Sequence, residues 1–305
     1  MIGIQEIGTY LPPLKIDNRS QKSRFDPITI EQGVGFKQVH RMDLSDEPET
    51  LCLKAFEQLK TKMNIDVNEI SFIGVVSQQI QIKLPNLAAK LHGDLQLPEK
   101  CISLDYGLGC AGFVQGVLSA QSLMESQNLK YGLLFNVETL SRYIHDDRDG
   151  LSLIFSDAAT VCLLSSQSIY QPMSYTFGTI GKKGFELLIE EGELRMNGVA
   201  VYDFAVRTIP KEIKKHLSST GYNIESIDLF CFHQAGKKAV EKIQSLLQVS
   251  PEKAPFAAAE YGNTGSCSIP FLLENEIHKS SNKLIYICGF GSGLAWAGSL
   301  LKRVV

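Results

Sequence analysis

The stretch Leu104–Phe113, LDYGLGCAGF, decides how the rest of the chain is interpreted. The residues before it indicate the end of a short strand, and Val114–Met124 carries apolar residues at helical spacing. Cys110 is therefore expected at a strand-to-helix turn, where the first N–H groups of the helix lack intrahelical partners and the macrodipole is positive. A thiol placed there is expected to be shifted toward the nucleophilic thiolate. Taken alone, the stretch is equally compatible with Cys110 as a small buried apolar residue.

The composition is that of an ordinary globular protein. Of the 305 residues, 44% are hydrophobic and 21% are charged, and the net charge of −3 gives no pull toward nucleic acid or a membrane surface. No apolar run approaches the roughly 20 residues of a membrane helix, and the first residues lack the basic segment of a secretory signal. The seven cysteines are dispersed and form no C-x-x-C pair. We therefore expect a cytoplasmic protein with reduced thiols and no metal site.

Predicted strands and helices alternate along the chain, and their order repeats in the second half. The apolar strand Ile70–Val76, for example, is matched by Ser226–Phe232. The offset of about 155 residues is too long for a solenoid repeat. The pattern predicts an α/β protein of two duplicated halves, 1–167 and 168–305, each with a mainly parallel sheet covered by helices. The polar segment Lys15–Arg41 is expected to be a loop with short helical pieces.

Two further stretches carry residues capable of chemistry. One apolar strand ends directly before His233, and a Gly-rich turn around Asn263 leads into a helix. A histidine after a strand or an asparagine in a turn is usually structural. Cys110, His233 and Asn263, however, all follow strand ends of a duplicated fold, so we expect the three side chains to converge between the halves.

On these residues the chain resembles the β-ketoacyl-acyl carrier protein synthase III family of the thiolase superfamily. The matching stretches are Cys-Ala-Gly-Phe at 110–113, His-Gln-Ala at 233–235, Tyr-Gly-Asn-Thr at 261–264 and the Gly-rich segment 289–296. The resemblance covers essentially the whole chain. It implies a thiolase-like fold with the duplicated α/β halves in a layered αβαβα arrangement, the nucleophile in the N-terminal half and the histidine and asparagine in the C-terminal half.

The resemblance also implies a reaction, the decarboxylative Claisen condensation of a 3-oxoacyl-[acyl-carrier-protein] synthase III. Cys110 would take an acyl group from acyl-CoA or an acyl-carrier protein, and malonyl-carrier protein would then lose carbon dioxide and attack the thioester. His233 Nε2–H and the Asn263 amide would stabilise the charge on the malonyl oxygen. Backbone N–H groups of Cys110 and of the loop with Gly291 and Ser292 would hold the thioester oxygen, Ser292 standing where the family has glycine. No cofactor or metal is implied beyond these substrates.

Docking and assembly follow from the same resemblance. Lys237 and Lys238 would bind the acidic carrier protein, although such a lysine run is more often a solvated helix face. Leu84 matches a position that reaches across a dimer and limits acyl-chain length. A homodimer is expected, and the hydrophobicity of the segments 114–124 and 131–137 is an independent hint of one.

The chain departs from the family pattern in its CoA-binding residues. The tryptophan of the adenine pocket is absent, since the one tryptophan is Trp296. Lys37 stands where arginine is usual, and Arg148 lies within a residue of another family arginine. These departures leave open whether the acyl donor is a CoA or a carrier-protein thioester, and the sequence does not fix the acyl-chain length.

Three alternative functions share the fold. A hydroxymethylglutaryl-CoA synthase needs a catalytic glutamate where this chain has Ser77, Gln78 and Gln79, and an amide cannot act as a general acid or base. A family acyltransferase of a secondary-metabolite or polysaccharide pathway would transfer the acyl group without decarboxylation. A silent heterodimer partner would have no need of the reactive Cys110.

Overall fold

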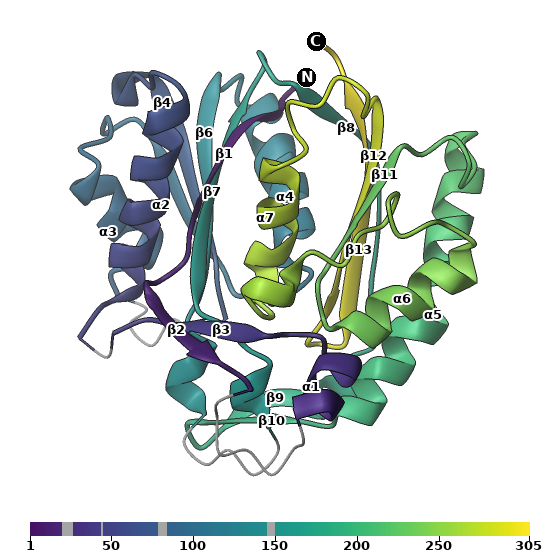
Figure 1. Ribbon diagram of the computed structural model, residues 1–305. Coiled ribbons are helices and arrows are strands. Elements are labelled where there is room, and N and C mark those ends of the chain that lie inside the picture. The colour runs from purple at the N-terminus through teal and green to yellow at the C-terminus, as the bar shows by residue number, and fades with distance from the viewer. Residues whose placement is uncertain (20–26, 44, 79–83, 145–149) are drawn as a thin grey trace.

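The computed structural model describes residues 1–19, 27–43, 45–78, 84–144 and 150–305. Figure 1 shows five layers in the order helices, sheet, helices, sheet, helices. The outer layers are α2 with α3 on one side and α5 with α6 on the other, and α4 and α7 lie between the sheets. The predicted αβαβα layering is therefore confirmed. The helices are α1 (Pro27–Gly33), α2 (Pro48–Lys62), α3 (Leu87–Asp94), α4 (Gly112–Ser126), α5 (Gly198–Thr220), α6 (Lys237–Leu247) and α7 (Ser268–Glu274).

The strands of the two halves follow the same spatial plan. The N-terminal half has the order β1-β7-β6-β4-β5, and the C-terminal half has the matching order β8-β13-β12-β11. One bridge between Ile4 and Tyr170 joins the two sheets. The bounds are β1 (Gly3–Tyr10), β4 (Ile70–Val76), β5 (Ile102–Tyr106), β6 (Tyr131–Glu138), β7 (Ala158–Ser165), β8 (Tyr170–Thr179), β11 (Leu229–Phe232), β12 (Leu284–Gly291) and β13 (Ala295–Arg303).

The prediction of mainly parallel sheets is wrong. The pairs β4/β5, β4/β6 and β11/β12 are parallel, whereas β1, β7, β8 and β13 pair antiparallel with their neighbours. The reason is visible in the connection from β12 to β13, which spans only residues 292–294. So short a connection permits a hairpin but not the crossover that parallel neighbours need. The predicted boundary at 167/168 falls between β7 and β8, and the division into two domains stays a prediction.

The hydrophobicity of the central helix has a cause within one chain. The buried side chains of α4, among them Phe113, Val117 and Met124, belong to a core cluster that includes residues of both sheets. The strand β6 is likewise buried along nearly its whole length between helices. A helix covered on two faces needs apolar residues on both. These two segments therefore give no independent indication of a dimer, and the homodimer stays a prediction.

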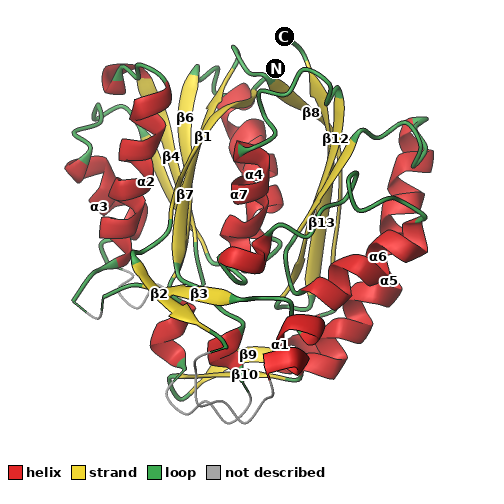
Figure 2. Ribbon diagram, viewed as in Figure 1, coloured by secondary structure: helices red, strands yellow, loops and turns green. Residues whose placement is uncertain are grey.

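Small elements gather at the lower end of the layers in Figure 2. The segment Lys15–Arg41 is not merely a loop with helical pieces, because its ends pair as a two-stranded ribbon of β2 (Leu14–Asp17) and β3 (Gln38–Arg41). A second hairpin pairs β9 (Leu187–Glu190) with β10 (Glu193–Met196). Short 3₁₀ turns are η1 (Val67–Glu69), η2 (Leu140–Tyr143), η3 (Leu151–Leu153), η4 (Gly181–Glu186), η5 (Ala258–Glu260) and η6 (Gly265–Cys267).

The single tryptophan belongs to the core of the C-terminal half. Trp296 lies on β13, and its ring centroid is 6.3 Å from that of Phe204 on α5. A side chain at Gly178 on the neighbouring strand would overlap the indole ring, so glycine is required there. No helix in the described ranges is both long and apolar enough to cross a membrane.

Candidate active site

Cys110 occupies the strand-to-helix turn that the sequence predicts. It lies between the end of β5 and the start of α4, and only 7% of its surface is exposed. The β12 strand of the other half packs directly on it. A Cβ atom at Gly291 would lie 2.8 Å from Cys110 Cβ and 2.9 Å from its Sγ, and one at Gly289 would lie 2.5 Å from the Cys110 carbonyl oxygen. The two glycines therefore allow a C-terminal strand to reach the nucleophile of the N-terminal half.

The Cys110 thiol is not shifted toward thiolate, and that prediction is wrong. Burial raises its pKa to about 12, the negative charge of Glu138 acts in the same direction, and backbone hydrogen bonds from Cys110 and Ser292 oppose both. The reason is that desolvation of the charged form outweighs the amide dipoles at this helix start. Cys110 is therefore a neutral thiol at pH 7, and its proton must leave as the nucleophile reacts.

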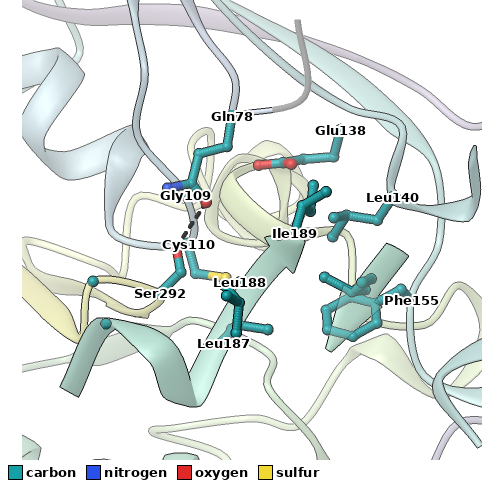
Figure 3. Close-up of a pocket in the computed structure, with 14 residues that line it drawn as sticks. Gln78, Gly109, Cys110, Glu138, Leu140, Phe155, Leu187, Leu188, Ile189 and Ser292 are labelled. Atoms are coloured by element: carbon teal, nitrogen blue, oxygen red, sulfur yellow. Dashed lines mark hydrogen bonds between the residues drawn. The ribbon is translucent and has the colours of Figure 1, made fainter. Parts of the chain in front are cut away.

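Two backbone amides bond the Cys110 sulfur, and their predicted role at the thioester oxygen stays a prediction. They belong to Cys110 itself and to Ser292, which directly follows Gly291 at the end of β12. The serine side chain has room because residue 109 is a glycine: a Cβ atom there would overlap Ser292 Oγ. Ser292 Oγ donates a hydrogen bond to Gln78 Oε1 at 2.7 Å. The loop with the amide donor is thus tied to the end of β4 in the other half (Figure 3).

His233 is a buried neutral imidazole with a fixed orientation. It follows β11, its N–H donates to the Cys288 carbonyl, and its ring meets Phe290 edge-on at 5.4 Å between centroids. Ring Nδ1 lies 2.7 Å from Ser268 Oγ, which also accepts the Gln234 N–H. The Ser268 hydroxyl can therefore donate to Nδ1, which places the ring proton on Nε2. Burial lowers the pKa of His233 to about 3, against the opposing effect of a backbone hydrogen bond with Gly265.

Asn263 presents a donor for a similar reason. It is buried in a short parallel bridge with Phe155, and its Oδ1 accepts the Gly265 N–H at 2.9 Å. Because the carbonyl end of the side chain is taken, the NH₂ end is left as the donor. Gly265 is also the residue whose backbone bonds His233, so one glycine links the two predicted donors.

A cavity of about 390 Å³ opens beside Cys110 (Figure 3). Cys110 and Gly265 both line it. His233 and Asn263 do not line it, but each contacts Gly265. Its polar side is formed by Gln78, Glu138 and Ser292. Its apolar side suits an alkyl group and is formed by Leu140, Phe155, Leu187, Leu188, Ile189 and Leu194.

The sequence reasoning missed two parts of this cavity. Glu138 is 1% exposed, and Figure 3 shows its carboxylate reaching into the space that the Cys110 sulfur faces. An acidic residue directly after the apolar run 131–137 was the available signal. The β9–β10 hairpin, which supplies Leu187, Leu188, Ile189 and Leu194, is the second part.

The other predicted site residues lie outside the cavity. Lys237 and Lys238 begin α6, where Lys237 is half-buried against Gly35 and Lys238 is exposed. Leu84 is 90% exposed and does not line the cavity of its own chain. Lys37 forms an ion pair with Glu260 at 2.9 Å.

Two residues discussed from the sequence, Gln79 and Arg148, lie outside the described residues. In the part of the chain that is described, no group of three or more His, Cys, Asp or Glu side chains is arranged to hold a metal ion.

Comparisons with known proteins all indicate the same protein family. A family model described as 3-oxoacyl-[acyl-carrier-protein (ACP)] synthase III matches residues 104–181, and the corresponding C-terminal model matches 217–303. A β-ketoacyl-[acyl-carrier-protein] synthase III of Streptococcus uberis is 29% identical, with 90% of each chain covered. A crystal structure of a 3-oxoacyl-(acyl-carrier protein) synthase from Burkholderia xenovorans superposes with a TM-score of 0.90 at 27% identity, covering 99% of this chain and 94% of that one. A 3-oxoacyl-(acyl-carrier-protein) synthase III structure reaches 0.92 at 23% identity over 99% of both chains.

Proposed function

The chain belongs to the 3-oxoacyl-[acyl-carrier-protein] synthase III family, and from that membership we propose that it condenses an acyl thioester with malonyl-carrier protein through an acyl-Cys110 intermediate. It is accordingly an acyltransferase of the condensing type. The observation that carries the proposal is that two kinds of donor are found at one cavity. Backbone amides bond the Cys110 sulfur, and two neutral side-chain donors, His233 and Asn263, both contact Gly265, which lines the same cavity as Cys110.

In the first step, the Cys110 sulfur attacks the carbonyl carbon of the acyl donor. The new C–S bond forms, the donor thiolate leaves, and the thiol proton of Cys110 goes to that leaving group. In this proposal the amides of Cys110 and Ser292, which bond the sulfur in the free enzyme, stabilise the oxyanion of this intermediate. The apolar cavity wall receives the acyl group.

In the second step, the malonyl thioester loses carbon dioxide, and the electron pair of the broken C–C bond passes to the thioester enolate. His233 Nε2–H and the Asn263 NH₂ group donate to the enolate oxygen. The carbanion attacks the acyl-Cys110 carbonyl, a C–C bond forms, and the Cys110 thiolate leaves and is reprotonated. Because carbon dioxide is the leaving group, the proposed reaction calls for no cofactor.

The alternatives are less well supported. Ser77, Gln78 and Gln79 stand where a hydroxymethylglutaryl-CoA synthase needs an acid, and the amide oxygen of Gln78 accepts the Ser292 hydroxyl. A transferase that does not decarboxylate its substrate would need no pair of buried donors for an enolate oxygen. A silent partner would not retain Cys110 among glycines and amides.

The acyl donor and the assembly are further parts of the proposal. Both acyl-CoA and acyl-carrier protein remain candidate donors, since Lys37 is engaged with Glu260 rather than free for a phosphate. We propose a cytoplasmic homodimer, supported by seven free cysteines and by the edge strand β5 with its exposed Leu104. The 90% exposed Leu84 would then bury its side chain against the second subunit.

Ser268→Ala is expected to lower the rate of condensation about tenfold and to leave acyl loading of Cys110 unchanged, because Nδ1 of His233 loses the donor that sets its tautomer. The measurement is a single turnover of pre-acylated enzyme with malonyl-carrier protein. Ser218→Ala is the control, since the exposed Ser218 hydroxyl bonds the Lys214 carbonyl on α5, away from the cavity. Equal losses of loading and condensation would contradict the assigned role.

Lys238→Glu is expected to raise the KM for malonyl-carrier protein by about threefold to tenfold with little change in kcat. The reason is that an exposed surface charge affects the association of two proteins more than the chemical step. Steady-state kinetics at two salt concentrations measure this effect. Lys100→Glu, at another exposed lysine, is the control. An unchanged KM would remove Lys238 from the docking surface.

The test of the proposed function itself is intact-protein mass spectrometry after incubation with a panel of acyl-CoAs and acyl-carrier proteins. One donor should leave its acyl mass on the wild type, and added malonyl-carrier protein should discharge it as a 3-oxoacyl product. An acyl-enzyme that malonyl-carrier protein leaves intact would instead favour the acyltransferase alternative.

A further inference from the structure

Glu138 is a buried carboxylate in the cavity of the nucleophile to which neither step above assigns a role. It ends β6 in the N-terminal half, is 1% exposed, and lines the cavity together with Cys110 (Figure 3). Burying a carboxylate costs free energy unless hydrogen bonds compensate. The burial of the Glu138 carboxylate beside the reacting thiol therefore needs a structural explanation.

The first part of the explanation is a contact with the turn that carries the donors. Glu138 Oε1 accepts the Ser266 N–H at 2.9 Å. The preceding Gly265 has φ of +55°, and a Cβ there would lie 2.7 Å from the Glu138 carboxyl carbon, so the carboxylate packs against bare backbone. Since the Gly265 backbone bonds both Asn263 and His233, Glu138 reaches from the nucleophile's half to the segment that orients both donors.

The second part is the direction in which the charge acts. Burial has the largest effect on the pKa of the Cys110 thiol. Among the described residues, Glu138 is the charged side chain that raises this pKa further. It acts in the same sense on Cys267, a buried residue of the same turn. His233 is governed by its burial and by the Gly265 backbone, so the imidazole stays neutral and does not offset the carboxylate.

We propose that Glu138 is a positioning residue of this site, which holds the turn 263–268 at its working distance from Cys110 and keeps a negative charge facing the nucleophile. The proposal rests on the proposed function for its effect on condensation. The hydrogen bond to Ser266 sets where the His233 and Asn263 donors lie relative to the acyl group. The charge disfavours a free thiolate, which lowers the reactivity of Cys110 toward electrophiles.

Two variants separate these effects. Glu138→Gln removes the charge and keeps an oxygen that accepts the Ser266 N–H. Glu138→Asp keeps the charge and withdraws the oxygens from Ser266 by one methylene. Glu125→Gln is the matched control, because Glu125 also accepts a backbone N–H, that of Ile2, and does not line the cavity.

The first readout is the rate at which iodoacetamide alkylates Cys110 between pH 7 and 10, followed on the Cys110 peptide by mass spectrometry. Glu138→Gln should react about threefold to tenfold faster than wild type at a given pH, because a nearby negative charge is gone. Glu125→Gln should match wild type. Equal alkylation profiles for Glu138→Gln and wild type would overturn the role of the charge, and this readout needs no enzymatic activity.

The second readout is a single turnover of pre-acylated enzyme with malonyl-carrier protein. Glu138→Asp should lose about tenfold to a hundredfold in condensation while its acyl loading is retained, because small displacements of catalytic groups are costly. Wild-type condensation by Glu138→Asp would overturn the positioning role. If wild type itself loads but does not condense, the proposed function fails instead, and the alkylation result still decides the role of the charge.

Discussion

Replacement of Cys110 by alanine is expected to abolish acyl loading and to reduce condensation by at least about 10³-fold, because no other group in the cavity can form the thioester. The structure predicts that the variant folds. The side chain is small, and Gly289 and Gly291 already pack against the turn, so alanine removes only the sulfur. The melting temperature should therefore change little.

The measurement is the mass gained on incubation with each acyl donor, together with the rate of 3-oxoacyl product. Cys101→Ala is the matched control, since Cys101 is partly exposed and lies outside the cavity. It should load and condense like wild type. An acyl mass on Cys110→Ala that maps to another cysteine would show that the nucleophile has been misassigned.

Asn263→Asp is expected to lower condensation by about 10²–10³-fold while Cys110 still loads its acyl group, because one donor to the enolate is replaced by an acceptor. The aspartate oxygen can still accept the Gly265 N–H, so the turn should keep its shape. The remaining donor, His233, is a neutral imidazole in the wild type, because burial lowers its pKa to about 3.

Pre-acylated enzyme, mixed with malonyl-carrier protein and quenched at intervals, measures this step apart from loading. Asn275→Asp, an asparagine that bonds a helix carbonyl outside the cavity, is the control and should condense normally. If Asn263→Asp condenses as fast as wild type, Asn263 is not a donor. If loading falls by the same factor, its role is structural.

The layered, duplicated architecture could be predicted because its signals are local and repeated. Apolar runs such as Ile70–Val76 mark buried strands, and the same order of elements recurs in both halves. Strand direction could not be predicted in this way, since it depends on how long a connection must be to cross a sheet. The short ribbon of β2 and β3 was missed because four-residue strands carry too little alternation to be distinguished from a loop.

The candidate site, too, could be predicted only in part. Cys110, His233 and Asn263 stand at strand ends or in Gly-rich turns, where position in the sequence already indicates position in the fold. Glu138 has its partner 128 residues away, at Ser266, and nothing near it in the sequence announces that contact. The pKa of Cys110 was predicted in the wrong direction because a rule about helix starts is local, whereas the burial that outweighs it comes from β12 of the other half.

Trp296 provides an intrinsic fluorescence signal from one half of the protein. It is the one tryptophan in the sequence, and it is packed among the core side chains of the C-terminal half. Emission excited at the red edge of the indole band therefore comes from that half alone. Circular dichroism in the peptide region, by contrast, sums over both halves. A comparison of the two signals during unfolding tests, without an added label, whether the two halves, which share a helical layer, melt as one unit.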